Sequence, residues 1–172
     1  MTQIITREPI KVVADVIQHE LEMAPGAVMV YNARYEAPTT EGLYIVLSLV
    51  GPGKIIGNKN TIVDAAGIEL SETQETALMQ MIQIDVMSAN DEARQRCFEI
   101  VQALASTYAL QQMDTYQINI ASHVAGFADV SEVEGDARIN RYTMTIMVNA
   151  LYTKTKAIDS YGTFNKEVHL NA

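Results

Sequence analysis

The residues from Leu78 to Tyr108 change from a two-residue to a 3.6-residue repeat of apolar side chains. Alternate positions between 78 and 86 are mostly apolar, which predicts a strand with one face against a core. Ser88, Asn90 and Asp91 follow, and their side-chain oxygens can accept hydrogen bonds from the first turn of a helix. One apolar stripe then predicts a helix over 91–108. Its members are Ala93, Cys97, Ile100, Val101, Leu104 and Tyr108.

The composition predicts one soluble domain. Of 172 residues, 48% are apolar and 19% are charged, so the chain can bury a core. We expect residues 1–172 to be a single domain, with 153–172 as a C-terminal arm or an extra strand. Cys97 is the single cysteine, and its place on the stripe favours a core residue over a reactive thiol. Neither a signal peptide nor about 18 successive apolar residues is found, which predicts a soluble protein made in a reducing compartment.

The charge of the chain excludes some classes of partner. Twelve Lys and Arg stand against 21 Asp and Glu, which gives a net charge of −9. Broad binding to nucleic acid depends on cationic side chains that release counterions from phosphates. We therefore expect neither specific DNA binding nor an anionic membrane as a partner.

Two elements precede the central stretch and a long polar strand leads into it. Pro9 suits the first turn of a helix, and an apolar face predicts a helix over 9–22. The segment 43–50 is nearly all apolar, which predicts a strand covered on both faces. Residues 55–71 form a hairpin or a long loop. Strand character resumes near Glu72, so 72–87 is one long strand whose polar half projects beyond the body and needs a partner.

The second half of the chain adds further strands. We expect a connection at 111–114, a short strand at 116–121, an acidic loop at 128–140 and a half-buried strand at 141–152. The predicted fold class is α+β, a mostly antiparallel β-sheet with two main helices packed on one face. Its principal strands are 43–50, 78–87 and 141–152.

The sequence contains no complete motif for catalysis or cofactor binding. The sequence Gly51 to Lys54 lacks the further glycine and the Ser or Thr of a phosphate-binding loop, so a tight turn is the better interpretation. The three histidines are not at the spacing of metal ligands. The acidic segment lacks the ligand spacing of a calcium loop. We therefore predict no enzyme activity, no cofactor and no metal.

Several short patterns resemble the tail terminator and neck proteins of long-tailed bacteriophages. The first is a strand that ends in a polar segment and passes into a helix beginning with Ala-Arg. Its residues are Gln83, Asp85, Ser88, Ala93 and Arg94. A late strand follows the charged stretch 136–142, and the loop leading into strand 43–50 also fits, at Asn32, Ala33, Pro38 and Tyr44. The resemblance covers about residues 28–152.

This resemblance implies a structural protein of the virion that is made in the host cytoplasm. It implies an α+β subunit of a homo-oligomeric, hexameric ring that caps the tail tube, ends tail growth and joins the tail to neck and connector proteins. Genome DNA would pass through the ring without specific binding. An acidic loop with Asp129, Glu132, Glu134 and Asp136 is then a candidate for facing the channel, although the same carboxylates could serve only solubility.

A second group of residues is the candidate contact between subunits or with partners. It lies in and after the turn at 51–54 and comprises Gly53, Lys54, Asn58, Lys59 and Asn60. The alternative from another class is a small acidic enzyme or ligand-binding domain, whose site is assembled from residues far apart in the sequence. A deep pocket with converging His and carboxylate groups would favour that alternative.

Overall fold

The computed structural model describes residues 2–4, 7–31, 41–65, 69–121, 126–134 and 137–158. Over these residues the chain has three helices and nine strands, and the predicted α+β class is confirmed. The helices are α1 (Pro9–Glu20), α2 (Glu92–Leu104) and α3 (Thr107–Tyr116). The strands are β1 (Thr2–Ile4), β2 (Val28–Val30), β3 (Tyr44–Leu49), β4 (Lys54–Ala65), β5 (Glu69–Ser88), β6 (Ile118–Ile120), β7 (Ala128–Asp129), β8 (Glu132–Glu134) and β9 (Ala137–Ile158).

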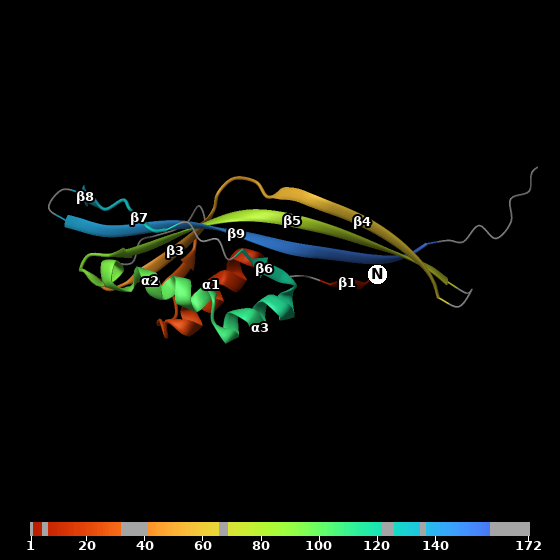
Figure 1. Ribbon diagram of the computed structural model, residues 1–172, viewed down its shortest axis with the longest axis horizontal. Coiled ribbons are helices and arrows are strands. Elements are labelled where there is room, and N and C mark those ends of the chain that lie inside the picture. The colour runs from red at the N-terminus through yellow and green to blue at the C-terminus, as the bar shows by residue number, and fades with distance from the viewer. Residues whose placement is uncertain are drawn as a thin grey trace, which may run out of the picture.

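The strands β5 and β9 form the long axis of the molecule. They have 20 and 22 residues and pair antiparallel from Leu70 with Ile158 to Ser88 with Asn140. The helices cover only one half of this ladder, whereas β4 accompanies the other half (Figure 1). The predicted long strand with a projecting polar half is therefore confirmed.

The other strands line the two edges of the ladder. β3 and β4 pair with successive parts of β5, at 82–87 and 69–79. Along the opposite edge, β8, β7, β6 and β1 follow one another beside β9. β2 pairs parallel with β3, which makes the sheet mostly rather than wholly antiparallel. The predicted strand over 43–50 is covered on both faces only at Tyr44–Leu47, since the burial ends there.

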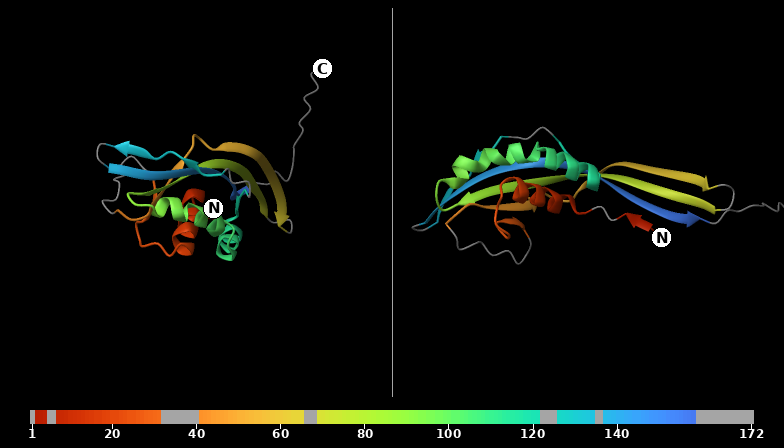
Figure 2. Two further views of the ribbon diagram at one scale, coloured as in Figure 1. Left: turned by 60° about the vertical axis from the view of Figure 1, so that its left-hand side comes forward. Right: turned by 90° about the horizontal axis from the view of Figure 1, so that it is seen from below.

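The core lies between the three helices and one face of the sheet (Figure 2). Alternate residues of β5 and β9 point into it, because side chains in a strand alternate between the two faces. Its fully buried members include Val13, Ile17, Ile82, Ile84, Ile100, Ile146 and Val148. Cys97 is only 1% exposed, as the helical stripe predicted.

The start of α2 follows the predicted capping. Ser88 Oγ accepts a hydrogen bond from the Ala93 N–H at 2.9 Å, and Asn90 Oδ1 accepts one from the Glu92 N–H at 2.9 Å. Asp91 occupies the N-cap position without a capping bond from its side chain. The two hydrogen bonds satisfy N–H groups that have no partner within the helix, and so fix where strand ends and helix begins.

The predicted helix over 91–108 is wrong in its last turn, where the chain breaks and starts a second helix. Ser106 Oγ accepts from the Ala109 N–H at 3.0 Å and caps α3. This local bond competes with continuation of the first helix. The segment 111–114, predicted as a connection, therefore lies within α3, and Tyr108 of the predicted stripe belongs to the second helix. Val101 of that stripe is 36% exposed.

Two segments for which a loop was predicted or considered, 55–71 and 128–140, contain strands. The hairpin interpretation of 55–71 is confirmed, because β4 pairs antiparallel with β5. The acidic loop over 128–140 is wrong, because β7 and β8 pair with β9 and satisfy their backbone groups there. The last strand extends beyond 141–152 at both ends. Residues 153–158 therefore continue β9 and are no separate strand, and 159–172 lie outside the described residues.

Candidate interaction surface

Half of the ladder carries no helix, and we call this half the extension. It comprises β4, residues 69–79 of β5, residues 149–158 of β9, and β1. The remaining described residues form the body. Ala150 and Tyr152, at the start of the extension, still pack on the core, and beyond them no described helix covers either face (Figure 2).

The outer edge of β4 is open along 12 residues of the described chain. β4 pairs with β5 on one side, and no described strand pairs with its other side. A β-bulge lies between Ile55 and Gly57, and Lys54 and Lys59 flank it. Bulges and lysines are features by which proteins discourage edge pairing. They protect the half of β4 near the body, whereas residues 60–63 have neither a bulge nor a charge.

Large aliphatic side chains are exposed on β4. Ile55 is 64% exposed, Ile62 is 60% exposed and Val63 is 50% exposed. In the register, Ile55 lies opposite Leu78 and Ile62 opposite Glu72, so both isoleucines share one face. Asn58 and Asn60 lie between them on that face, and we call these four residues the isoleucine face. A mixed apolar and amide surface of this kind is suited to a protein partner.

A network of polar side chains ties the three long strands of the extension together. Lys156 Nζ of β9 lies 2.5 Å from Glu72 Oε2 of β5, and Gln74 and Asn60 donate hydrogen bonds to Glu72 Oε1. These bonds, led by that from Lys156, lower the pKa of Glu72 from 4.5 to about 2. Glu72 is 9% exposed although no helix covers it, because its polar neighbours surround it.

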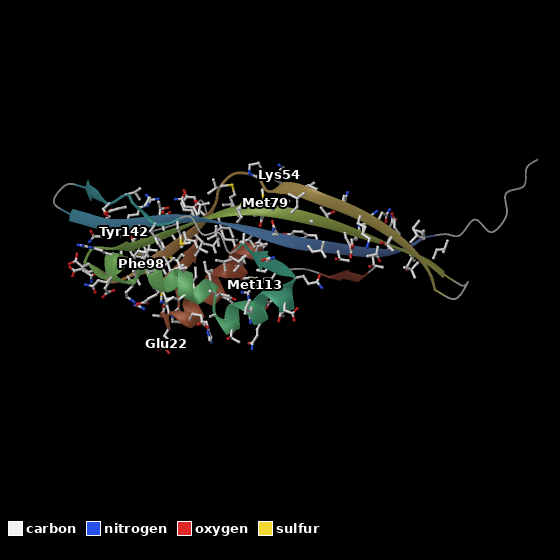
Figure 3. The ribbon with its side chains drawn as sticks, in the orientation of Figure 1. Glu22, Lys54, Met79, Phe98, Met113 and Tyr142 are labelled. Carbon is white, nitrogen blue, oxygen red and sulfur yellow. The ribbon has the colours of Figure 1, made fainter. Side chains whose placement is uncertain are left out.

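The structure brings the predicted contact residues together. Lys54, Asn58, Lys59 and Asn60 all lie on β4, and Gly53 precedes it. A Cβ at Gly53 would come within 3.1 Å of Leu78 Cδ1, so this close approach favours glycine. Residues 58–60 line a polar surface cavity of about 290 Å³ together with Gln74 and Thr76. Figure 3 places Lys54 at the start of β4 and Met79 beside it on β5.

The acidic residues lie at the opposite end of the ladder from the extension. Asp129 is exposed on β7 and accepts hydrogen bonds from the Ser131 N–H at 3.0 Å and from Tyr142 Oη at 3.2 Å. The Tyr142 pKa is raised by burial and then by this carboxylate. The structure describes only the backbone of Glu132 and Glu134, on β8, and Asp136 lies outside the described residues. The channel-facing role of these residues stays a prediction.

A second cavity, which the sequence analysis did not identify, lies where the extension leaves the body. We call it the elbow pocket. Its volume is about 420 Å³, and its lining includes Ile10, Val30, Tyr31, Leu49, Gln80 and Tyr152. Leu49 is 49% exposed and Tyr31 is 58% exposed. Apart from Tyr31, which follows β2, these residues come from α1, β2, β3, β5 and β9, so no local pattern could reveal the pocket.

A third cavity is an apolar groove of about 270 Å³ on the helical side of the body. Leu104, Leu110, Met113 and Ile120 contribute to its lining. Figure 3 shows Met113 and Phe98 on this helical layer, and Phe98 is 65% exposed and packs edge to face on Phe127. The groove contains no titratable side chain, and its composition is that of a packing surface.

The described residues form neither a metal centre nor a helix that spans a membrane. Within the described residues, no three His, Cys, Asp or Glu side chains are grouped as metal ligands would be. No described helix is long and apolar enough to span a membrane. The sequence matches no model of a known protein family and no curated protein.

Proposed function

We propose that the chain is a structural subunit of a bacteriophage virion. It forms a ring that caps the tail tube, ends tail growth and joins the tail to the head and neck. The observation that carries this proposal is the extension, in which an open strand edge and exposed isoleucines project from the body. Exposed edges of this kind are usually covered or paired, and a subunit that assembles with copies of itself supplies the cover.

The remaining parts of the proposal follow from the resemblance of the sequence to tail terminator and neck proteins. The ring is hexameric, lies in the tail-neck region and has no catalytic activity. The net charge of −9 per subunit supports a channel through which DNA passes without being held, because few cationic side chains are available for phosphates. The acidic segment at 128–136 faces either this channel or the solvent.

An enzyme or ligand-binding domain is the alternative, and it has less support. Converging histidine and carboxylate groups would favour it, but none of the three cavities described above is lined by a histidine. The elbow pocket has the volume of a small-molecule site. A small molecule that raises the melting temperature of the purified chain and is displaced by Leu49→Trp would support the alternative.

The test of the proposal is assembly on tails. Purified protein is added to tube-bearing particles that lack it, and rings at the tube end are scored by negative-stain microscopy. The variant lacking residues 55–68 loses β4 and is expected to fold, because the core lies in the body, but it should not cap tubes. Normal capping by this folded variant would show that residues 55–68 are not the contact. Failure of the unmodified chain to form rings on any tube would contradict the proposed function itself.

A further inference from the structure

The outer edge of β4 has no partner strand in the described chain, and β4 of a second copy fits it. We propose that two free subunits join by antiparallel pairing of residues 59–65 of β4, with Ile62 of one copy opposite Ile62 of the other. The two copies are related by a twofold axis. This dimer goes beyond the proposed function and does not rest on it, because it forms in the absence of tails.

The half of β4 that lies far from the body has the residues of a strand that pairs well. Thr61, Ile62 and Val63 are β-branched, a type of side chain that is enriched in strands. Ile62 is 60% exposed and Val63 is 50% exposed. An exposed edge without a bulge or a charge, as at 60–63, is a template for pairing with another strand. A strand is therefore the kind of partner that this edge fits.

The β-bulge of β4 sets the register of the pairing. It lies at 55–57 and would interrupt a regular ladder. With Ile62 on the twofold axis, the ladder takes in 59–65 and reaches the end of β4, while the bulge stays outside. An axis at Thr61 would bring the bulge into the ladder, and an axis at Val63 would shorten the ladder. The pairing centred on Ile62 is thus the longest regular one.

The side chains that meet in this register are compatible. The two copies of Ile62 lie opposite each other on one face, and Thr61 lies opposite Val63 of the partner subunit on the other face. Pairs of β-branched side chains across antiparallel strands stabilise a sheet. The two copies of Lys59 lie about 20 Å apart along the strands, which exceeds the screening length of about 8 Å at physiological salt. Lys59 also has a counter-charge in its own subunit, because its Nζ lies 3.9 Å from Glu75 Oε2.

The distribution of charge favours a contact between two extensions. The segments 54–79 and 149–158 contain four lysines and four Asp or Glu residues, so they are neutral. All nine net negative charges lie elsewhere in the chain. Two extensions in contact therefore add no net like-charge repulsion, whereas two bodies in contact would repel each other.

Antiparallel pairing also keeps the two acidic bodies apart. β4 runs away from its body (Figure 1), so the bodies lie at opposite ends of the dimer. Ile62 lies eight residues after Lys54, where β4 begins. At about 3.3 Å per residue in each copy, the bodies are separated by about 50 Å, which is several times the screening length. The dimer occupies the edge to which the proposed ring assigns its contact, so free subunits would not join into rings away from a tube.

The first test is a disulfide across the twofold axis. The variant Ile62→Cys is purified and oxidised in the absence of tails, and the products are separated without reductant. Residues directly opposite in antiparallel strands have Cα atoms about 4.5–5.5 Å apart, which is within the span of a disulfide. We therefore expect a covalent dimer of twice the mass of 19.0 kDa. Native Cys97 is buried and should not take part.

The adjacent variant Val63→Cys is the matched control. Val63 is similarly exposed, but in the proposed register its two copies lie on either side of the axis, with Cα atoms about 8 Å apart. A disulfide does not span this distance. At least about tenfold more covalent dimer from Ile62→Cys than from Val63→Cys supports the proposal. Equal yields, or no dimer from either variant, overturn it and leave the proposed ring untouched.

Sedimentation of the chain over a range of concentrations gives an independent test. The mass of the unmodified chain should rise toward twice 19.0 kDa. Ile62→Lys places two like charges directly opposite and should raise the dissociation constant at least about tenfold. Ile55→Lys is the control, because Ile55 is 64% exposed on the same face but lies outside the paired segment, and it should change the constant less than about twofold. Equal effects of the two changes, with unaltered melting temperatures, would contradict pairing through 59–65.

Hydrogen exchange distinguishes a second copy from a cover within the same chain. Alternate N–H groups of an edge strand point away from its neighbour. For residues 59–65, the exchange of these groups should slow as the protein concentration rises. Protection that is already complete in the monomer would mean that a segment of the same chain covers the edge, and would overturn the proposal.

Discussion

The body and the extension use the same two strands but stabilise them differently. In the body, β5 and β9 carry isoleucines and valines that are fully buried under the helices. In the extension, Lys156 pairs with Glu72 and Thr155 bonds to Thr73 across the ladder, and Gln74 donates to Glu72 along β5. The body is therefore stabilised by apolar burial, and the extension by backbone pairing and polar contacts. Mutations should separate the two mechanisms.

The largest difference is expected for isoleucine truncation. Ile84 is 0% exposed in the body, and Ile84→Ala should lower the free energy of unfolding by about 2–5 kcal/mol, because it removes buried methyl groups and leaves a cavity. Ile62→Ala in the extension should change it by less than about 0.5 kcal/mol. Urea unfolding of both variants measures the difference. Equal losses would mean that the extension has a core of its own.

A smaller difference is expected for the two ion pairs. Arg141 Nε donates to Asp85 Oδ1 at 3.1 Å, and the Asp85 side chain is 5% exposed. Arg141→Ala should cost about 1–3 kcal/mol, because the buried carboxylate then depends on Gln83 alone. Lys156→Ala, the matched change at Glu72, should leave global unfolding nearly unchanged and lower hydrogen-exchange protection in β4 and β5 only. A global loss from Lys156→Ala would show that the two regions unfold as one unit.

The smallest expected effect is a local dependence on pH. The Glu72 pKa is lowered from 4.5 to about 2 in the folded chain. A lowered pKa means that the ionised carboxylate stabilises the extension above pH 4.5, and that this stabilisation is lost as the pH falls toward 2. Protection of the extension from hydrogen exchange, corrected for intrinsic rates, should decrease between pH 5 and pH 2.5 in the unmodified chain. Glu72→Gln should show a weaker decrease, and an identical decrease in both would assign the effect to other carboxylates.

Sequence patterns predicted the parts of the fold that repeat over many residues. The alternation in 78–86 and in 141–152, the Pro9 start of α1 and the capping by Ser88 and Asn90 are all local, and the structure confirms them. The break at Ser106 was missed because the apolar stripe continues across it. The strands β7 and β8 were missed because their charged side chains resemble a loop, although their backbones pair with β9.

The candidate surface could be predicted only in part. Positions in the segment that forms β4 were expected to contact a partner because the polar half of the predicted strand over 72–87 indicated a projection. The elbow pocket and the Glu72–Lys156 pair could not be predicted. The first is lined by five separate elements, and the second joins residues 84 positions apart through the register of the ladder.

The uninterrupted ladder also sets the order in which the chain can fold. Ser88 and Asn140 pair within the body, at the end far from the extension, and are 52 residues apart in the chain, whereas Leu70 and Ile158 are 88 apart. Closing the shorter loop costs less conformational entropy, and it allows the apolar side chains of the body to be buried immediately. Pairing therefore begins at the body and proceeds outward one residue pair at a time. A newly made chain thus acquires a stable core before it presents the open edge of β4, which reduces the chance of premature aggregation.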